Sequence, residues 1–196
     1  MKAYIGNHPP YFGPYQFAGL LKFVGVPEKT AYNLGGKLQG TWVEKILEWM
    51  QPKRRVWVSI DNHDTWSMDH TLALIILPML KQLKATKHGA PNVDDEHVPE
   101  HLRSTSAGPK EDEYDVDEHH FKRWDWVLDE MIWAFTQKTL DNDTEQFFDH
   151  SGVDHSTELL EQVHAIKFDK LGLDAHEDRK QRAFELFGKY YQALWD

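Results

Sequence analysis

The densest group of side chains able to do chemistry lies in a short stretch between residues 61 and 70. It combines carboxylates and imidazoles at Asp61, His63, Asp64, Asp69 and His70. These side chains are common ligands of divalent metal ions. A metal held there would activate a water molecule for attack on a nucleotide or a phosphate ester. One hypothesis for this chain is therefore a metal-dependent hydrolase that uses a divalent metal.

The same residues also suit a structural role at the start of a helix. Asp64 is a good helix N-cap, and Asp69 would stabilise the positive end of the helix that follows. A metal-dependent phosphohydrolase of the His-Asp class would need this pair on a helix, with further ligands on both sides. Here the pair precedes the expected helix, and only His8 lies upstream. The sequence favours the structural role.

A second group of residues suggests a binding surface on an expected helix over residues 117–138. Asp125 and Asp129 are four residues apart, and Trp126 and Trp133 are seven apart. Four-residue spacing places two carboxylates on one helix face, where they repel each other slightly unless a cation is near. Exposed aromatic residues beside them are typical anchors of protein interfaces. We expect these four residues, together with the loop over about 88–116, to contact a protein partner.

Hydrophobic periodicity predicts the elements that carry these residues. Six segments have helical spacing or helix boundary residues, namely 15–23, 30–50, 65–86, 117–138, 157–170 and 174–194. Gly172 is expected to end the fifth helix, and Asp174 to cap the sixth. Leu72–Leu80 is apolar on every side, which indicates the central helix of the core. The stripe on 117–138 has heptad spacing and consists of Phe121, Trp124, Leu128, Met131 and Phe135.

Two short segments predict a small β-ribbon. Val56, Val58 and Ile60 alternate with other residues between 55 and 61, and residues 2–5 can pair with them. Two strands form a ribbon and not a sheet that defines the fold. The sequence thus predicts a mainly α protein, a single bundle-like domain of five or six helices over residues 1–196. A long loop over about 88–116 would lie on its surface, or be disordered, or be functional.

Composition excludes several classes of protein. The chain has 196 residues, no cysteine, eight tryptophans and twelve histidines. The lack of cysteine excludes disulfide scaffolds, thiolate zinc sites and thiol catalysis. The longest apolar run, nine residues, is too short to span a membrane, and Met1–Gly6 lacks the apolar centre of a signal peptide. We therefore expect an intracellular protein without membrane contact.

Charge is unevenly distributed along the chain. Residues 1–91 carry 11 basic and 6 acidic side chains, residues 92–130 carry 4 and 13, and residues 131–196 carry 7 and 13. The net charge is −10. Such asymmetry can steer a partner toward the protein. The basic residues are too dispersed to indicate nucleic-acid binding.

Three blocks of the sequence resemble a known group of proteins. They are residues 64–73 running into 76–84, residues 121–131, and residues 186–191. With these blocks, the chain resembles an uncharacterised family of small proteins of tailed bacteriophages, over most of its length from Gly6 onward. The resemblance implies a phage origin and expression in the host bacterial cytoplasm. It implies no activity, cofactor or catalytic residue.

The leading hypothesis is a non-enzymatic phage accessory protein that acts by binding. It would be a host-takeover factor, a counter-defence factor or a minor assembly protein, with incorporation into the virion left open. Its partner would be a host or phage protein, or a second copy of itself. The metal-dependent hydrolase is the alternative.

Overall fold

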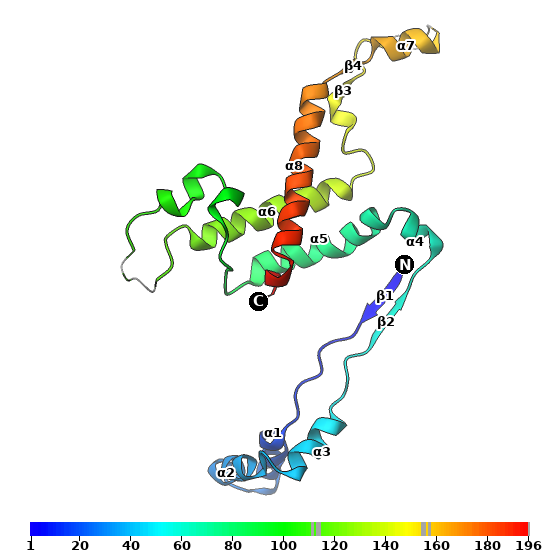
Figure 1. Cartoon of the computed structure of the whole chain (residues 1–196). Coiled ribbons are helices and arrows are strands. Elements are labelled where there is room, and N and C mark those ends of the chain that lie inside the picture. Colours follow the sequence, from blue (N-terminus) through cyan, green and yellow to red (C-terminus); the bar gives the residue numbers. More distant parts are fainter. Residues whose placement is uncertain (111, 113–114, 154–155, 157, 196) are drawn as a thin grey trace. The chain divides into compact units, whose positions relative to one another are not determined.

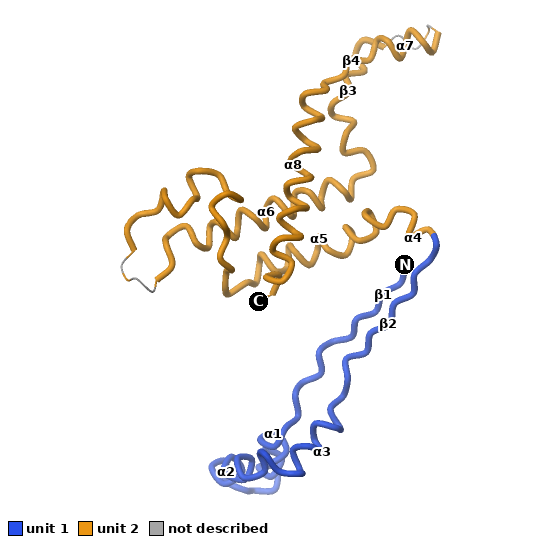
Figure 2. The backbone as a smooth tube through the Cα atoms, in the orientation of Figure 1, with its two compact units in different colours: residues 1–62 blue, residues 63–196 orange. Residues whose placement is uncertain are grey.

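The computed structural model describes residues 1–110, 112, 115–153, 156 and 158–195 (Figure 1). The fold is mainly helical with two small two-stranded sheets, which confirms the predicted fold class. The chain divides into two compact units, residues 1–62 (unit 1) and 63–196 (unit 2), shown in Figure 2. That the whole chain forms a single domain stays a prediction.

The β-ribbon of unit 1 confirms the pairing expected from sequence. Strand β1 (Lys2–Ile5) runs antiparallel to β2 (Val56–Ser59), with Lys2 opposite Ser59 and Ile5 opposite Val56. Side chains alternate between the two faces of such a ribbon. Every residue of both strands is exposed.

The helical part of unit 1 contains α1 (Pro14–Gly19), α2 (Glu28–Leu38) and α3 (Trp42–Met50). A single helix over 30–50 was predicted, and that prediction was wrong. Gly40 adopts a φ of +74° between α2 and α3, a left-handed conformation that a helix cannot contain and that glycine adopts without steric cost. Thr41 then begins α3, because its Oγ1 accepts a hydrogen bond from the Val43 backbone N–H at 3.3 Å.

Unit 2 is built on helices that pack in pairs around its core. Helix α6 packs against both α5 and α8. The short strands β3 (Phe148–Asp149) and β4 (Lys167–Phe168) pair antiparallel. The helices are α4 (Asn62–Trp66, which starts at the boundary between the units), α5 (Met68–Thr86), α6 (His120–Lys138), α7 (Leu159–Ala165) and α8 (Lys170–Lys189), followed by the short 3-10 helix η6 (Tyr191–Ala193).

The core of unit 2 is centred on α6. Trp124, Leu128 and Met131 of the predicted heptad stripe are fully buried, whereas Phe121 is 48% exposed. The expectation that Leu72–Leu80 is the central core segment was wrong. Of that segment only Ala73 and Leu80 are buried, because α5 contacts the core along one side and leaves its other apolar side uncovered.

The segment 88–116 is neither a plain loop nor detached from the core. It contains three short 3-10 helices, η2 (Asp95–His97), η3 (Glu100–Leu102) and η4 (Ser104–Ser106). Val93 and Val98 are buried in the hydrophobic core of unit 2. The segment therefore wraps over the bundle, and its residues 111, 113 and 114 lie outside the described residues.

The last long helix begins earlier than predicted. Gly172 does not end a helix, because α8 begins at Lys170 and includes it. The Oδ1 atom of Asp169 accepts a hydrogen bond from the Gly172 backbone N–H at 2.9 Å, so Asp169 is the cap and Asp174 is not. The described residues form eight α-helices where five or six were predicted, because the predicted helices 30–50 and 65–86 are each divided in two. None of these helices has the length and apolar character needed to cross a membrane.

Candidate functional site

The five residues predicted to bind a metal lie on both sides of the boundary between the units. Asp61 belongs to unit 1, whereas the other four belong to unit 2. His63 and Asp64 lie on α4, and Asp69 and His70 lie in the first turn of α5. The His63 ring stacks on Trp66 with the ring centroids 6.3 Å apart. A joint metal site of all five residues stays a prediction.

Two of these residues bind the end of α6. The Asp69 carboxylate lies 2.5 Å from the Nζ atom of Lys138. This hydrogen bond is the main reason why the pKa of Asp69 is below its usual value. His70 Nδ1 lies 2.9 Å from the Lys138 carbonyl oxygen, which can only accept, so Nδ1 carries the hydrogen. Asp69 and His70 thus connect the start of α5 to the end of α6.

Two other groups in the described part of the chain bring a histidine and two carboxylates close together. Their ligand atoms lie within 4.8 Å of one another, as in a metal site. Neither group contains any of the five residues predicted from sequence. The groups are Asp94, Glu96 and His97, and Asp143, His176 and Glu177.

The group around Asp143 already holds a cation. Lys180 Nζ lies 2.5 Å from the Asp143 carboxylate and 2.7 Å from that of Glu177, while His176 Nε2 donates to Asp143 at 3.2 Å. Burial raises the pKa of Asp143, but the hydrogen bonds from Lys180 and His176 outweigh burial and lower it. Lys180 Nζ thus takes the place that a metal ion would need.

The group around His97 is arranged around a buried tyrosine. The Tyr190 hydroxyl accepts a hydrogen bond from the Asp94 backbone N–H at 3.0 Å and lies 2.8 Å from His97 Nδ1. Lys189 Nζ lies 3.3 Å from the Asp94 carboxylate. The Tyr190 hydroxyl thus contacts His97 Nδ1, and Lys189 pairs with the Asp94 carboxylate. The arrangement attaches the 88–116 segment to the end of α8 and favours a structural role over a metal site.

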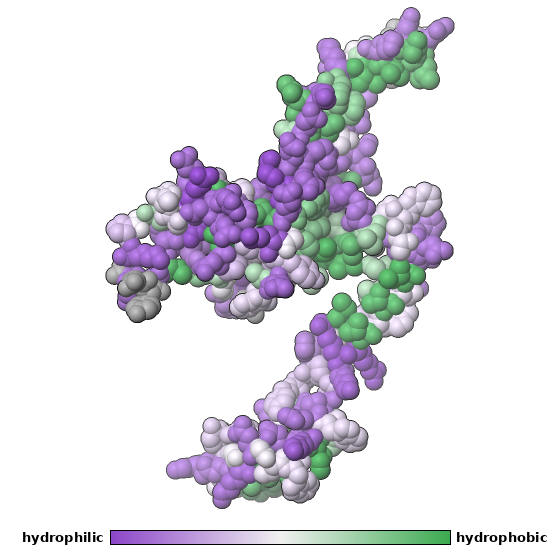
Figure 3. All heavy atoms as spheres, in the orientation of Figure 1, coloured by the Kyte–Doolittle hydropathy of each residue, from purple (hydrophilic) through white to green (hydrophobic). Residues whose placement is uncertain are grey.

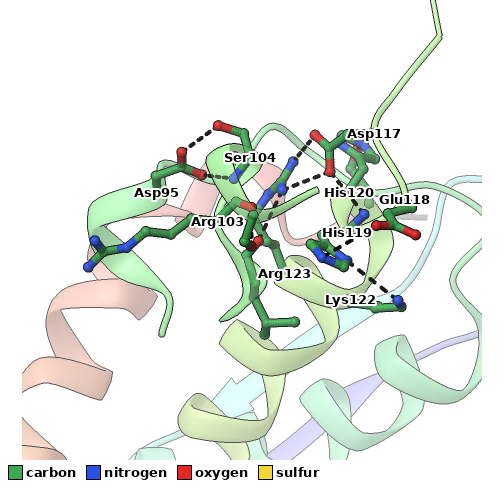
Figure 4. A network of polar contacts seen from close by, with 12 residues as sticks. Asp95, Arg103, Ser104, Asp117, Glu118, His119, His120, Lys122 and Arg123 are labelled. Atoms are coloured by element: carbon green, nitrogen blue, oxygen red, sulfur yellow. Dashed lines mark hydrogen bonds and ion pairs between the residues drawn. The ribbon is translucent and has the colours of Figure 1, made fainter. Parts of the chain in front are cut away.

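A third polar cluster secures the same segment to α6 (Figure 4). Arg123 donates two hydrogen bonds to the Asp117 carboxylate, at 2.9 and 2.6 Å, and a further one to the Leu102 carbonyl oxygen at 3.1 Å. The hydrogen bonds from Arg123 lower the pKa of Asp117 to about 2. Asp95 accepts two hydrogen bonds from Ser104 within the segment. The hydrogen bonds of Arg123 link the 88–116 segment and Asp117 to α6 through both of its terminal nitrogens, while its buried Nε has no hydrogen-bond partner among the described residues.

The two carboxylates of the predicted binding surface face α5. Asp125 lies 2.8 Å from Lys87 Nζ, and Asp129 lies 2.5 Å from Lys84 Nζ. Asp125 and Asp129 repel each other because they are four residues apart on one helix face, and the two ion pairs offset this repulsion. They are partly exposed, so each contributes at most about 1 kcal/mol.

The two tryptophans of that surface lie toward α8. The Arg179 guanidinium lies 3.9 Å from the centre of the Trp133 ring, a cation–π contact, and it donates two hydrogen bonds to Glu130. Trp126 lines a pocket of about 390 Å³ together with Arg182 and Lys189 of α8. The acids and the tryptophans therefore contact different helices. Partner binding by these four residues stays a prediction.

Unit 2 has an apolar groove between α5 and the end of the chain. Its volume is about 1080 Å³, and Figure 3 shows hydrophobic side chains gathered over α5. None of the lining residues that the structure describes carries a charge. They are Leu72, Ile76, Pro78, Met79, Leu80, Gln82, Leu83, Thr86, Phe187, Tyr191, Leu194 and Trp195. We call this surface the α5–α8 groove.

The sequence contained one signal for this groove and none for the Asp143 cluster. The apolar run Leu72–Leu80 predicts a helix that is buried on all sides, whereas in the structure one of its apolar sides lines the groove. Asp143 and Lys180 are 37 residues apart, and Asp143 follows α6 in a segment without periodicity. Only the packing of α8 on that segment brings the two together.

Comparison of the chain with protein-family models, curated proteins and solved structures found no match.

Proposed function

We propose that this protein acts by binding another protein, as an accessory protein of a tailed bacteriophage in the host bacterial cytoplasm. The resemblance to small phage proteins supports the phage setting. Host takeover, counter-defence and minor assembly, in or outside the virion, are the roles that this proposal covers. The binding surface is the α5–α8 groove, which takes an apolar helix face of the partner.

The observation that carries this proposal is the exposure of large apolar side chains around the groove. Met79 is 65% exposed, Tyr191 65% and Trp195 73%. Apolar surface gathered in one patch is unfavourable in water, at about 25 cal/mol for each Å², and such patches mark contact sites for other proteins. Tyrosine, tryptophan and methionine are also among the residues that are enriched at protein interfaces.

The chemistry of the groove defines the kind of partner. Because none of the described residues that line the groove is charged, a charged partner side chain would lose its hydration there without gaining an ion pair from them. An amphipathic helix that inserts apolar side chains from successive turns meets this condition. The hydroxyl of Tyr191 and the amide of Gln82 provide polar groups along the wall.

The metal-dependent hydrolase is not supported to the same degree. Asp69 and His70 hold the end of α6. In each of the two groups with metal-like spacing, a lysine of α8 contacts a carboxylate. Ion pairing explains these groups without a metal ion, and no observation favours turnover of a phosphate ester.

The experiment that tests the proposal is affinity capture from a lysate of phage-infected bacteria. The wild-type chain and the variants Met79→Glu and Leu74→Glu are used as bait. Leu74 is the matched control, because it lies on the same helix, is 55% exposed and does not line the groove. We expect the wild type and Leu74→Glu to retain the same partner and Met79→Glu to lose it. Equal capture by Met79→Glu would show that the groove is not the binding surface.

A further inference from the structure

Helix α3 of unit 1 has an apolar face that its own unit leaves exposed. Trp42, Ile46, Trp49 and Met50 are 72, 45, 84 and 65% exposed. Their spacing of i, i+4, i+7 and i+8 places all four on one side of the helix. This is the pattern of anchors by which a helix binds in an apolar groove.

The helix is held firmly enough to present this face. Leu47 is buried and attaches α3 to unit 1. At the start of the helix, Thr41 caps the Val43 N–H, and the Glu44 carboxylate accepts a hydrogen bond from the Gly40 N–H at 2.6 Å. A helix that is already ordered loses little conformational entropy on binding.

The α5–α8 groove is long enough to hold the exposed face of α3, and the two surfaces have the same apolar chemistry. The nine residues of α3 extend roughly 13 Å, and the groove follows α5 from Leu72 to Thr86, roughly 22 Å. Both surfaces are apolar and neither places a charge at its centre. Docking the α3 face in the groove would bury tryptophan and methionine side chains of both surfaces. It would leave no charged side chain buried without a partner.

The charges of the two units are opposite. Unit 1 contains 8 basic and 4 acidic residues, a net charge of +4, and unit 2 contains 14 basic and 28 acidic residues, a net charge of −14. Unit 1 of one molecule is therefore attracted to unit 2 of another. This attraction accelerates their encounter and disfavours contact between two acidic units.

We propose that the partner of the α5–α8 groove is a second copy of this chain, which inserts the Trp42–Trp49 face of its helix α3. This inference rests on the proposed function, because it names the occupant of the same groove. The interface joins two different surfaces, so each molecule both donates a helix and offers a groove.

The test uses the purified full-length chain and three variants, measured by size-exclusion chromatography with light scattering over a range of concentrations. Trp49→Glu damages the helix face and leaves the groove intact. Met79→Glu damages the groove and leaves α3 intact. Leu74→Glu is the control. Circular dichroism and thermal unfolding verify that each variant folds, which we expect because the three replaced side chains are exposed.

The wild type and Leu74→Glu are expected to self-associate. Trp49→Glu and Met79→Glu are each expected to associate at least about thirtyfold more weakly, the effect of losing an interface anchor. An equimolar mixture of the two variants is expected to form a heterodimer, because the intact α3 of Met79→Glu meets the intact groove of Trp49→Glu. This recovery is specific to an interface between two different surfaces.

Three outcomes overturn the inference. They are a wild type that is monomeric at all concentrations, association that survives Trp49→Glu, and a mixture that does not recover. A monomeric wild type whose captured partner is lost in Met79→Glu would leave the proposed function standing and show that the groove binds a different protein. If Met79→Glu changes neither capture nor self-association, the proposed function and the inference both fail.

Discussion

The carboxylate of Asp117 and the guanidinium of Arg123 form a bidentate ion pair that is almost completely buried. The two hydrogen bonds measure 2.9 and 2.6 Å, and the side chains of Arg123 and Asp117 are 6 and 11% exposed. Because Arg123 also donates to the Leu102 carbonyl oxygen, this pair connects the 88–116 segment to α6.

Replacing Asp117 by asparagine is expected to lower the free energy of unfolding by about 3 kcal/mol, because a buried guanidinium loses its counter-charge. Denaturant unfolding measures the difference. Asp129→Asn is the control, since its ion pair with Lys84 is half exposed and its loss should cost less than about 1 kcal/mol. Equal effects of the two substitutions would contradict the assigned role of Asp117.

The same pair predicts how stability depends on pH. The pKa of Asp117 is about 2 in the folded protein, against an ordinary value of 3.8. A carboxyl group with a lowered pKa stabilises the fold above its unfolded pKa, and this contribution, about 2 kcal/mol, is lost as the pH falls through the folded value. The stability gap between the wild type and Asp117→Asn should thus narrow between about pH 4 and pH 2. A constant gap in unfolding experiments across this window would refute the prediction.

The ammonium group of Lys180 is predicted to keep metal ions out of the Asp143 cluster. Lys180→Ala should destabilise the protein by about 3 kcal/mol, because Asp143 and Glu177 lose their buried cation. Adding zinc should then raise the Tm of this variant more than that of the wild type, since Asp143, His176 and Glu177 are ligands that zinc accepts. The double variant Lys180→Ala, His176→Ala should lose the zinc effect. If zinc raised the Tm of the wild type as much as that of Lys180→Ala, the prediction would be contradicted.

Tyr190→Phe tests the attachment of the 88–116 segment to α8. Without the hydroxyl, the Asp94 N–H and His97 Nδ1 lose a partner, and the free energy of unfolding should fall by about 1–3 kcal/mol. Tyr191→Phe is the matched control, because Tyr191 is 65% exposed and should tolerate the change. Equal unfolding midpoints for the two variants would show that the Tyr190 hydroxyl contributes nothing.

Much of the secondary structure was predictable because it depends on local spacing. The alternation of Val56 and Val58 predicted β2, and the heptad spacing from Trp124 to Phe135 predicted both α6 and its buried face. Errors occurred where one residue decides a boundary. The positive φ of Gly40 divides α2 from α3, and the Asp169 cap starts α8 before Gly172.

The burial of α5 was not predictable in the same way. An all-round apolar segment such as Leu72–Leu80 is compatible with a core helix, and equally with a helix that has one side in the core and the other in a binding groove. Only the placement of α6 and α8 decides between these cases. Leu80 is buried in the core cluster with residues of α6 and α8, whereas Met79 is 65% exposed.

By itself, the sequence determined the mainly helical class, the ribbon, the uneven charge along the chain and the absence of thiol chemistry, because these depend on residue types and short-range periodicity. The tertiary structure alone decided which polar residues meet. Asp143 reaches Lys180 across 37 residues, and Asp94 reaches Tyr190 across 96. Such contacts depend on how helices cross and on which turns face each other. The periodicity of a helix shows which of its faces is apolar, but it does not specify which other helix packs against that face.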